Sequence, residues 1–205
     1  MQGFIIDIKP CRDDDLIVLI LSDNHLYSTY RFYGARHSTI NIGYKIDFEL
    51  ESNYKSTIPR LKDVMHLGFP WIFDKDKLYL WQRFLKLFYP HLKDVEEVDP
   101  FYCTLLNELI SSISKQNAKR AICQAYIKLL EFEGRLHNDY ICLLCEVPIE
   151  HEVSLVRSFM PVHPNCTFSK KFDFYKIQEL FEDKSLISFS DEEVDYLWKI
   201  LVQGI

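Results

Sequence analysis

Residues 15–33 decide the fold of the first part of the chain. Asp15-Leu-Ile-Val-Leu-Ile-Leu-Ser22 is a continuous apolar run, which is typical of a strand buried on both faces or rolled into a barrel. Asp23-Asn-His25 has the chemistry of a tight reversal, and Leu26-Tyr-Ser-Thr-Tyr-Arg-Phe-Tyr33 then alternates in polarity. The sequence therefore predicts two neighbouring antiparallel strands at this point.

The stretches on either side extend the same pattern. Gln2–Lys9 and Gly43–Glu51 are rich in Ile, Tyr and Phe, and turn residues separate them from the central pair. Four or five short antiparallel strands in about 70 residues favour a small closed barrel over an open sheet, with the OB-fold as the candidate. We therefore expect residues 1–72 to form an N-terminal OB-fold domain.

From residue 73 onward the apolar period becomes helical. Three helices are predicted in succession, one on the face of Leu78, Trp81 and Phe88, and two centred near residues 109 and 126. Pro90 is expected to stop the first helix, and Gly134 to cap the third. Ser190-Asp-Glu-Glu193 predicts a capping box that opens a last helix, and a weaker helix is expected over Phe172–Glu182. The fold class is thus α+β with two domains, the second being helical and covering residues 73–205.

Two pairs of soft metal ligands interrupt the helical part. Cys142-Leu-Leu-Cys145 is followed by His163-Pro-Asn-Cys166, and each pair has two residues between its members. Four such donors favour tetrahedral Zn²⁺ in a closed structural site, within a zinc-knuckle loop over about residues 140–167. Two alternatives remain open: His151 takes the place of His163, or the cysteines form a cluster of buried thiols. The expected role of the metal is to stabilise the fold.

Composition describes a protein with a substantial core and no membrane segment. The 205 residues are 48% hydrophobic and 26% charged, with a net charge of −6. No apolar run reaches the roughly 18 residues of a membrane span, and the first residues lack a secretory signal, so a cytoplasmic location is expected. Reduced thiols follow from that location, and Cys11, Cys103 and Cys123 are expected to be inert buried side chains.

One stretch interleaves aromatic side chains with cations: Tyr30-Arg-Phe-Tyr-Gly-Ala-Arg-His37. Residues 28–62 hold six basic and three acidic groups on an otherwise acidic chain. Aromatic platforms beside cations suit single-stranded nucleic acid, because bases stack and phosphates pair with cations. The pattern equally fits a strand with core aromatics on one side and solvated arginines on the other. Gly34 indicates a bulge or a close backbone approach.

Leu129-Leu-Glu-Phe-Glu-Gly134 is followed after seven residues by Cys142. Two further stretches are Tyr33-Gly-Ala-Arg36 and Trp81-Gln-Arg-Phe-Leu-Lys-Leu-Phe88. In these stretches the chain resembles a known family, the bacterial recombination mediator RecO. The first is similar to the helix end and zinc knuckle of that family, the second lies where the family usually has Lys-Gly-Ala-Arg, and the third fits its first long helix. Tyr33 in place of lysine and His163 in place of a frequent cysteine are departures.

The resemblance implies a function in DNA repair and DNA recombination after DNA damage. A protein of this kind binds single- and double-stranded DNA, anneals complementary strands, and assists RecA loading onto strands coated with single-strand-binding protein, together with RecR. It would contact the RecA filament only indirectly, and it would be associated with the nucleoid. Its helical domain would dock the C-terminal tail of single-strand-binding protein.

With this resemblance, eight residues of the barrel become candidates for DNA binding. Five would contact phosphates: Arg31, Arg36, Lys45, Arg60 and Lys62. Three would stack on bases: Tyr30, Phe32 and His37.

Enzymatic activity finds no support in the sequence. It contains no phosphate-binding loop, dinucleotide glycine pattern, nucleophile elbow or metalloprotease helix motif. Asp13-Asp-Asp15 favours a solvated turn over a cation site. We therefore expect a protein that is not an enzyme. Two alternatives stay open, namely a zinc-stapled protein-interaction module without direct DNA binding, and a hydrolase whose zinc is open to water.

Overall fold

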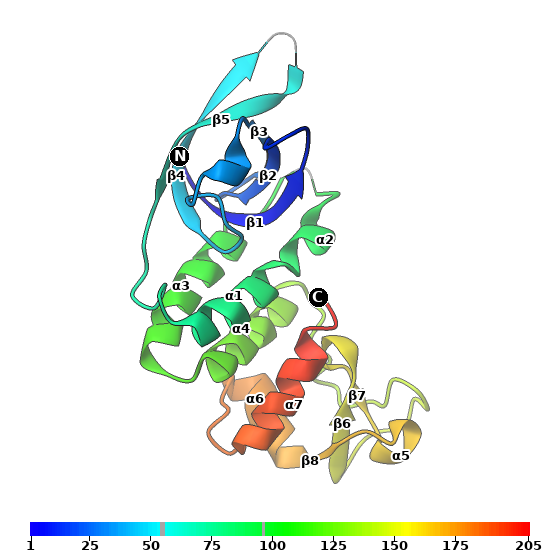
Figure 1. The fold of residues 1–205 in the computed structure, drawn as a ribbon. Helices are drawn as coiled ribbons and strands as arrows, with labels where there is room; N and C mark the ends of the chain where they lie inside the picture. Colours follow the sequence, from blue (N-terminus) through cyan, green and yellow to red (C-terminus); the bar gives the residue numbers. More distant parts are fainter. Residues whose placement is uncertain (54–55, 96) are drawn as a thin grey trace. The chain divides into compact units, whose positions relative to one another are not determined.

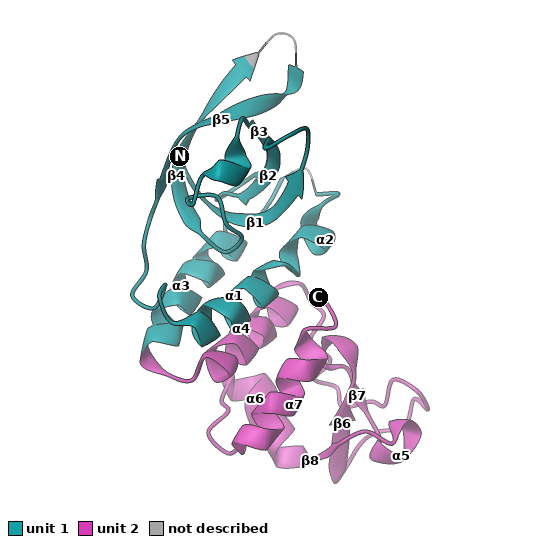
Figure 2. Cartoon of the chain, viewed as in Figure 1, with its two compact units in different colours: residues 1–114 teal, residues 115–205 magenta. Residues whose placement is uncertain are grey.

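The computed structural model describes residues 1–53, 56–95 and 97–205. These residues form two compact units, residues 1–114 and residues 115–205 (Figure 2). The packing thus groups the first helices with the barrel, although the barrel strands themselves end at His66. The division into a barrel domain and a helical domain at residue 72 stays a prediction.

The first unit begins with a closed five-stranded barrel, which confirms the predicted fold of this part (Figure 1). Its strands run in the order β1-β2-β3-β5-β4, and β4 pairs back onto β1. The strand bounds are β1 (Gln2–Pro10), β2 (Leu16–Leu21), β3 (Leu26–Arg31), β4 (Lys45–Asn53) and β5 (Ser56–His66), with the short 3-10 helix η1 (Gly34–Arg36) after β3.

The barrel closes around side chains that the apolar runs supply. Every pairing around it is antiparallel except one, a short parallel contact in which Tyr30 of β3 lies opposite Arg60 of β5. All residues of β2 except Ile17 are buried, so the continuous apolar run is covered on both faces. The core consists of Ile5, Leu16, Val18, Ile20, Ile40, Ile46, Phe48 and Leu61.

Three helices complete the first unit: α1 (Lys75–Leu85), α2 (Phe88–Leu92) and α3 (Phe101–Lys115). The structure divides the first predicted helix into two: α1 ends before Pro90, and α2 contains this residue. Pro90 is the third residue of α2, and proline is tolerated there because the first-turn N–H groups lack an acceptor within the helix. The expectation that Pro90 stops the helix was therefore wrong.

Trp81 of α1 joins the helices to the barrel. Its indole N–H donates to the carbonyl oxygen of Gly43 at 2.7 Å, and its side chain is fully buried. Gly43 has a φ of +88°, and a Cβ there would lie 2.9 Å from the Trp81 ring. The glycine is thus required both by the backbone conformation and by the close approach of the indole.

The second unit is built from helices around a small sheet. Its helices are α4 (Ala118–Phe132), α5 (Pro164–Thr167), α6 (Phe174–Asp183) and α7 (Asp191–Leu201), with the 3-10 helix η2 (Arg157–Phe159). Its antiparallel strands β6 (Glu152–Leu155), β7 (Pro161–Val162) and β8 (Lys171–Asp173) have the order β7-β6-β8. This sheet was not predicted from the sequence. Gly134 follows α4 with a φ of +66°, and the Ser190 capping box is present at α7. None of the described helices is long and apolar enough to cross a membrane.

The position of Trp81 leads to a stability prediction. Trp81→Ala should lower the free energy of unfolding by about 3–5 kcal/mol, because it empties a fully buried site and leaves the Gly43 carbonyl without its donor. Tyr79→Ala, in the same helix but 57% exposed, should change it by roughly 0.5 kcal/mol. Urea denaturation followed by circular dichroism measures both. Equal losses for the two variants would contradict the role of Trp81.

Candidate metal centre and nucleic-acid interface

Four potential ligands from two separate segments converge in the second unit. The Sγ atoms of Cys142, Cys145 and Cys166 and a ring nitrogen of His163 all lie within 4.8 Å of one another. In a tetrahedral zinc site with Zn–S bonds of 2.3 Å, ligand atoms are about 3.8 Å apart, so small adjustments suffice to coordinate an ion. His151 is exposed and is not part of this group.

Local backbone geometry forms the first knuckle. Cys142 N–H donates to the Val147 carbonyl at 3.0 Å, and Glu146 N–H donates to the Cys142 carbonyl at 2.9 Å. Glu146 has a φ of +58°, which completes the tight turn. The turn directs Cys142 and Cys145 to the same side, as the two-residue spacing predicted.

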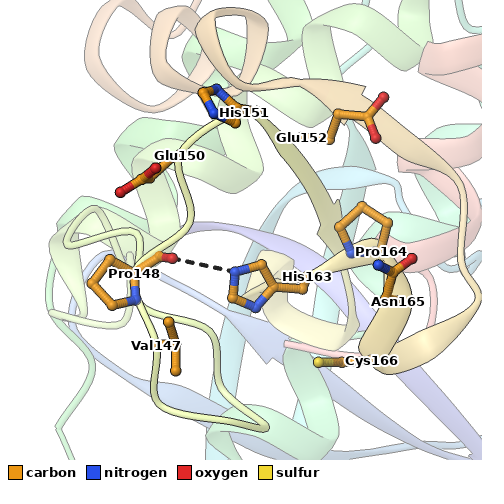
Figure 3. Close-up of a pocket in the computed structure, with 9 residues that line it drawn as sticks. All are labelled: Val147, Pro148, Glu150, His151, Glu152, His163, Pro164, Asn165 and Cys166. Atoms are coloured by element: carbon orange, nitrogen blue, oxygen red, sulfur yellow. Dashed lines mark hydrogen bonds between the residues drawn. The ribbon is translucent and has the colours of Figure 1, made fainter.

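The second knuckle follows β7. His163 precedes α5, which contains Cys166, and the Cys166 N–H donates to the His163 carbonyl. His163 Nδ1 lies 3.2 Å from Cys145 Sγ, whereas Nε2 lies 3.2 Å from the Pro148 carbonyl oxygen (Figure 3). A carbonyl partner on Nε2 holds the proton there and leaves Nδ1 as the ligand atom.

The protein environment prepares one thiolate for a metal. Burial disfavours the charged form of Cys142, but hydrogen bonds from the backbone of His163, Cys145 and Leu144 outweigh it and lower the pKa of Cys142 to about 6. Burial and the neighbouring thiols Cys145 and Cys142 instead raise the pKa of Cys166 to about 11. Three thiols and an imidazole fit zinc, since a divalent cation compensates the thiolates that otherwise repel one another. This Cys/His cluster can therefore bind a metal ion.

The other cysteines have different surroundings. Cys103 and Cys123 are buried, as expected, and burial raises the pKa of each to about 12. Cys11 is exposed, so the expectation of burial was wrong for this residue, which follows the last residue of β1.

An open pocket of about 630 Å³ adjoins the metal cluster (Figure 3). Glu150, His151 and Glu152 line it together with His163 and Cys166. In Figure 3, His151 lies at the far end of this lining from Cys166. If all four donors bound one tetrahedral metal ion, no position would remain open for a water molecule.

The second set of candidate residues lies at the β3–β5 seam, where Tyr30 of β3 pairs with Arg60 of β5. Arg31 donates from Nη1 to the Leu61 carbonyl at 2.8 Å, and its Nε is buried without a partner among the residues described. The Arg31 side chain thus helps to hold β3 against β5 where the barrel closes. Gly34 follows with its Cα against Leu16, since a Cβ there would lie 2.9 Å from that side chain. The expected close backbone approach is therefore present.

Aromatic rings and a guanidinium gather at this seam. Phe32 is 45% exposed, and the Arg60 guanidinium carbon lies 4.9 Å from its ring centroid. The Tyr30 ring meets Phe32 edge-on at 4.9 Å. Tyr30 donates to Asp15, and this hydrogen bond is the main cause that raises the pKa of Tyr30 to about 12. Tyr30 is therefore held in place, which leaves Phe32 as the accessible platform.

Nearby, Tyr33 and Arg36 form a second aromatic–cation pair. Tyr33 is 57% exposed, and the Arg36 guanidinium carbon lies 5.3 Å from its ring centroid. The Tyr33 backbone is left-handed, with a φ of +50°, and its N–H donates to Asp15 at 2.7 Å. Asp15 thus fixes both Tyr30 and Tyr33. The exposure of Tyr33 was not part of the sequence prediction.

Most of the candidate cations have carboxylate partners. Arg36 pairs with Asp14, its Nε donating at 2.6 Å. Lys62 Nζ lies 2.6 Å from Glu51 Oε1, and Arg60 Nη1 lies 3.8 Å from Glu51 Oε2. The hydrogen bond from Lys62 lowers the pKa of Glu51 below its ordinary value. Sequence reasoning missed these acidic partners, which reduce the positive charge of the surface.

The remaining two candidates lie apart from these pairs. Lys45 donates to the side chain of Asn107 in α3 at 2.9 Å, so it is directed towards a helix. His37 is exposed directly after η1. The structure therefore brings Tyr30, Phe32 and Arg60 together at the seam, with Lys62 joined to Arg60 through Glu51.

Comparison with known families gives one match. Residues 1–72, which include all five barrel strands, match the family model described as RecO N terminal. The barrel domain is thus similar to the N-terminal domain of RecO proteins. No curated protein matches the chain significantly. The RecO match supports a role in DNA repair and recombination for this chain, while residues 73–205 lie outside the matched region.

The metal cluster leads to a loading prediction. Purified chain should contain about one zinc ion per molecule, and Cys145→Ala should abolish that content, because three donors retain zinc poorly. Cys11→Ala removes an exposed cysteine outside the cluster and should leave the content unchanged. Inductively coupled plasma mass spectrometry measures both variants. Equal zinc in the two variants would show that the ion binds elsewhere.

Proposed function

We propose that this protein is a DNA repair and recombination mediator of the RecO kind, acting by binding and without covalent catalysis. Its barrel would bind single- and double-stranded DNA and bring complementary strands together for annealing. Together with RecR, it would assist RecA loading onto DNA coated with single-strand-binding protein. The observation that carries this proposal is the RecO N-terminal match over the same residues that form the closed barrel.

The surface of the barrel supports nucleic acid as the ligand. Phe32 and Tyr33 are exposed aromatic side chains, each with a guanidinium group within 5.3 Å of its ring centroid. A base can stack on such rings regardless of sequence, while the cations face the phosphates. Arg36, Arg60 and Lys62 are the phosphate contacts we favour on this face. Arg31 is held by its hydrogen bond to the Leu61 carbonyl.

The metal would act as a structural element. We assign zinc to Cys142, Cys145, His163 and Cys166, where it would join the two knuckles on either side of β6 and β7. Its free energy of binding would stabilise the second unit. The helical part of the chain would dock partners, among them the tail of single-strand-binding protein.

One observation favours a second candidate function, a zinc-stapled protein-interaction module that does not bind DNA. Arg36, Arg60 and Lys62 are already paired with the carboxylates of Asp14 and Glu51, which reduces the positive charge that they offer to a nucleic acid. A titration with DNA separates the two candidates, because only the mediator binds strands with strong salt dependence.

Fluorescence anisotropy with labelled single-stranded DNA at several salt concentrations tests the proposal. Arg36→Ala should weaken binding and make the slope of log K against log salt shallower by about 0.7, the value for one phosphate contact to a single strand. Lys199→Ala removes an exposed cation of α7 in the second unit and serves as the control. An unchanged slope for Arg36→Ala would remove Arg36 from the interface, and no binding by the folded wild type would favour the interaction module.

A further inference from the structure

The cations of the β3–β5 seam share one carboxylate. Glu51 of β4 lies opposite Arg60 of β5, and Glu49 lies opposite Lys62 in the same ladder. The two oxygens of Glu51 divide between the cations, since Oε1 accepts from Lys62 at 2.6 Å and Oε2 lies 3.8 Å from Arg60. The group therefore bridges two cations with two separate oxygens.

A phosphate group would make the same contacts. Its non-bridging oxygens also accept from a guanidinium and an ammonium group at once, and they carry a comparable charge. The Arg60 guanidinium already lies over Phe32, so an anion held between Arg60 and Lys62 would be adjacent to a ring on which a base can stack. Glu51 thus occupies the position that a nucleotide phosphate would take.

The pairing is easily exchanged. The side chains of Arg60, Glu51 and Lys62 are 41%, 43% and 48% exposed, so water and ions reach all three. Ion pairs with this exposure contribute little to stability and are screened by salt. An incoming phosphate therefore competes with a tethered carboxylate, and the carboxylate recaptures the cations as soon as the phosphate leaves.

We propose that Glu51 is a built-in competitor of the nucleic-acid phosphate at the cluster formed by Phe32, Arg60 and Lys62. This proposal rests on the proposed function and adds regulation to it. The competitor lowers the affinity for a strand and speeds its release, because the cations regain a partner without diffusion. A protein that transfers strands to other proteins needs this property. Asp14 accepts a hydrogen bond from Arg36, whose guanidinium lies over the Tyr33 ring, so Asp14 would be a second competitor of the same kind.

Glu51→Gln tests the proposal as a gain of binding. The substitution keeps the shape of the side chain and removes its charge, which frees one cation for an additional phosphate. The affinity for labelled single-stranded DNA should rise about fivefold at 0.1 M salt, and the salt slope should steepen by about 0.7, as one added phosphate contact requires. Dissociation measured by stopped flow should slow by a similar factor.

Glu49→Gln is the matched control. Glu49 is exposed on the same strand, two residues away, and the structure records no ion pair for it within the described part of the chain. The Glu49→Gln variant loses the same charge as Glu51→Gln but breaks no ion pair. Its affinity for DNA should therefore change by less than about twofold. The double variant Glu51→Gln/Arg60→Ala should lose the gain. Circular dichroism checks that each variant is folded.

The outcomes separate this inference from the proposed function. Equal gains for Glu51→Gln and Glu49→Gln would overturn it, since overall charge would then explain the effect. Binding by the wild type with no gain in Glu51→Gln would overturn it and leave the proposed function intact. Binding by Glu51→Gln alone would support the competition and contradict strand binding by the native chain. No binding by either would overturn both.

Discussion

The short parallel contact between β3 and β5 is the interaction on which the candidate interface depends. It closes the barrel by pairing Tyr30 with Arg60, and Arg31 strengthens it through the Leu61 carbonyl. Residues about 30 positions apart in the sequence thereby become neighbours. Without this seam, Phe32 would have no guanidinium beside it, and the aromatic and basic residues would remain on separate strands.

In the second unit, two segments that are separate in the sequence are brought together by their potential metal ligands. Cys142 and Cys145 are separated from His163 and Cys166 by β6 and β7, yet the four ligand atoms meet. Backbone hydrogen bonds already lower the pKa of Cys142, so the protein contributes to the site before any ion binds. A metal bound at this position would join the two knuckles and stabilise the second unit.

The features predicted from the sequence were those that local patterns specify. The apolar run of β2, the two-residue spacing of the knuckles and the Ser190 capping box each depend on residues close together in the chain. Strand β5 was not delimited, because Pro59 interrupts it and a register shift with Asp63 at a φ of +46° obscures its alternation. The pairing of Glu51 with Arg60 and Lys62 follows from the register of β4 against β5, which the sequence alone does not specify.

The proposed function requires that the β3–β5 seam contacts nucleic acid. Photocrosslinking can examine this contact, with single-stranded DNA that carries 5-iodouracil and with mass spectrometry to locate the attached residues. Crosslinks are expected at Phe32 and Tyr33, the exposed rings beside Arg60 and Arg36. Crosslinks confined to residues 115–205 would contradict it and would place the nucleic-acid interface outside the barrel.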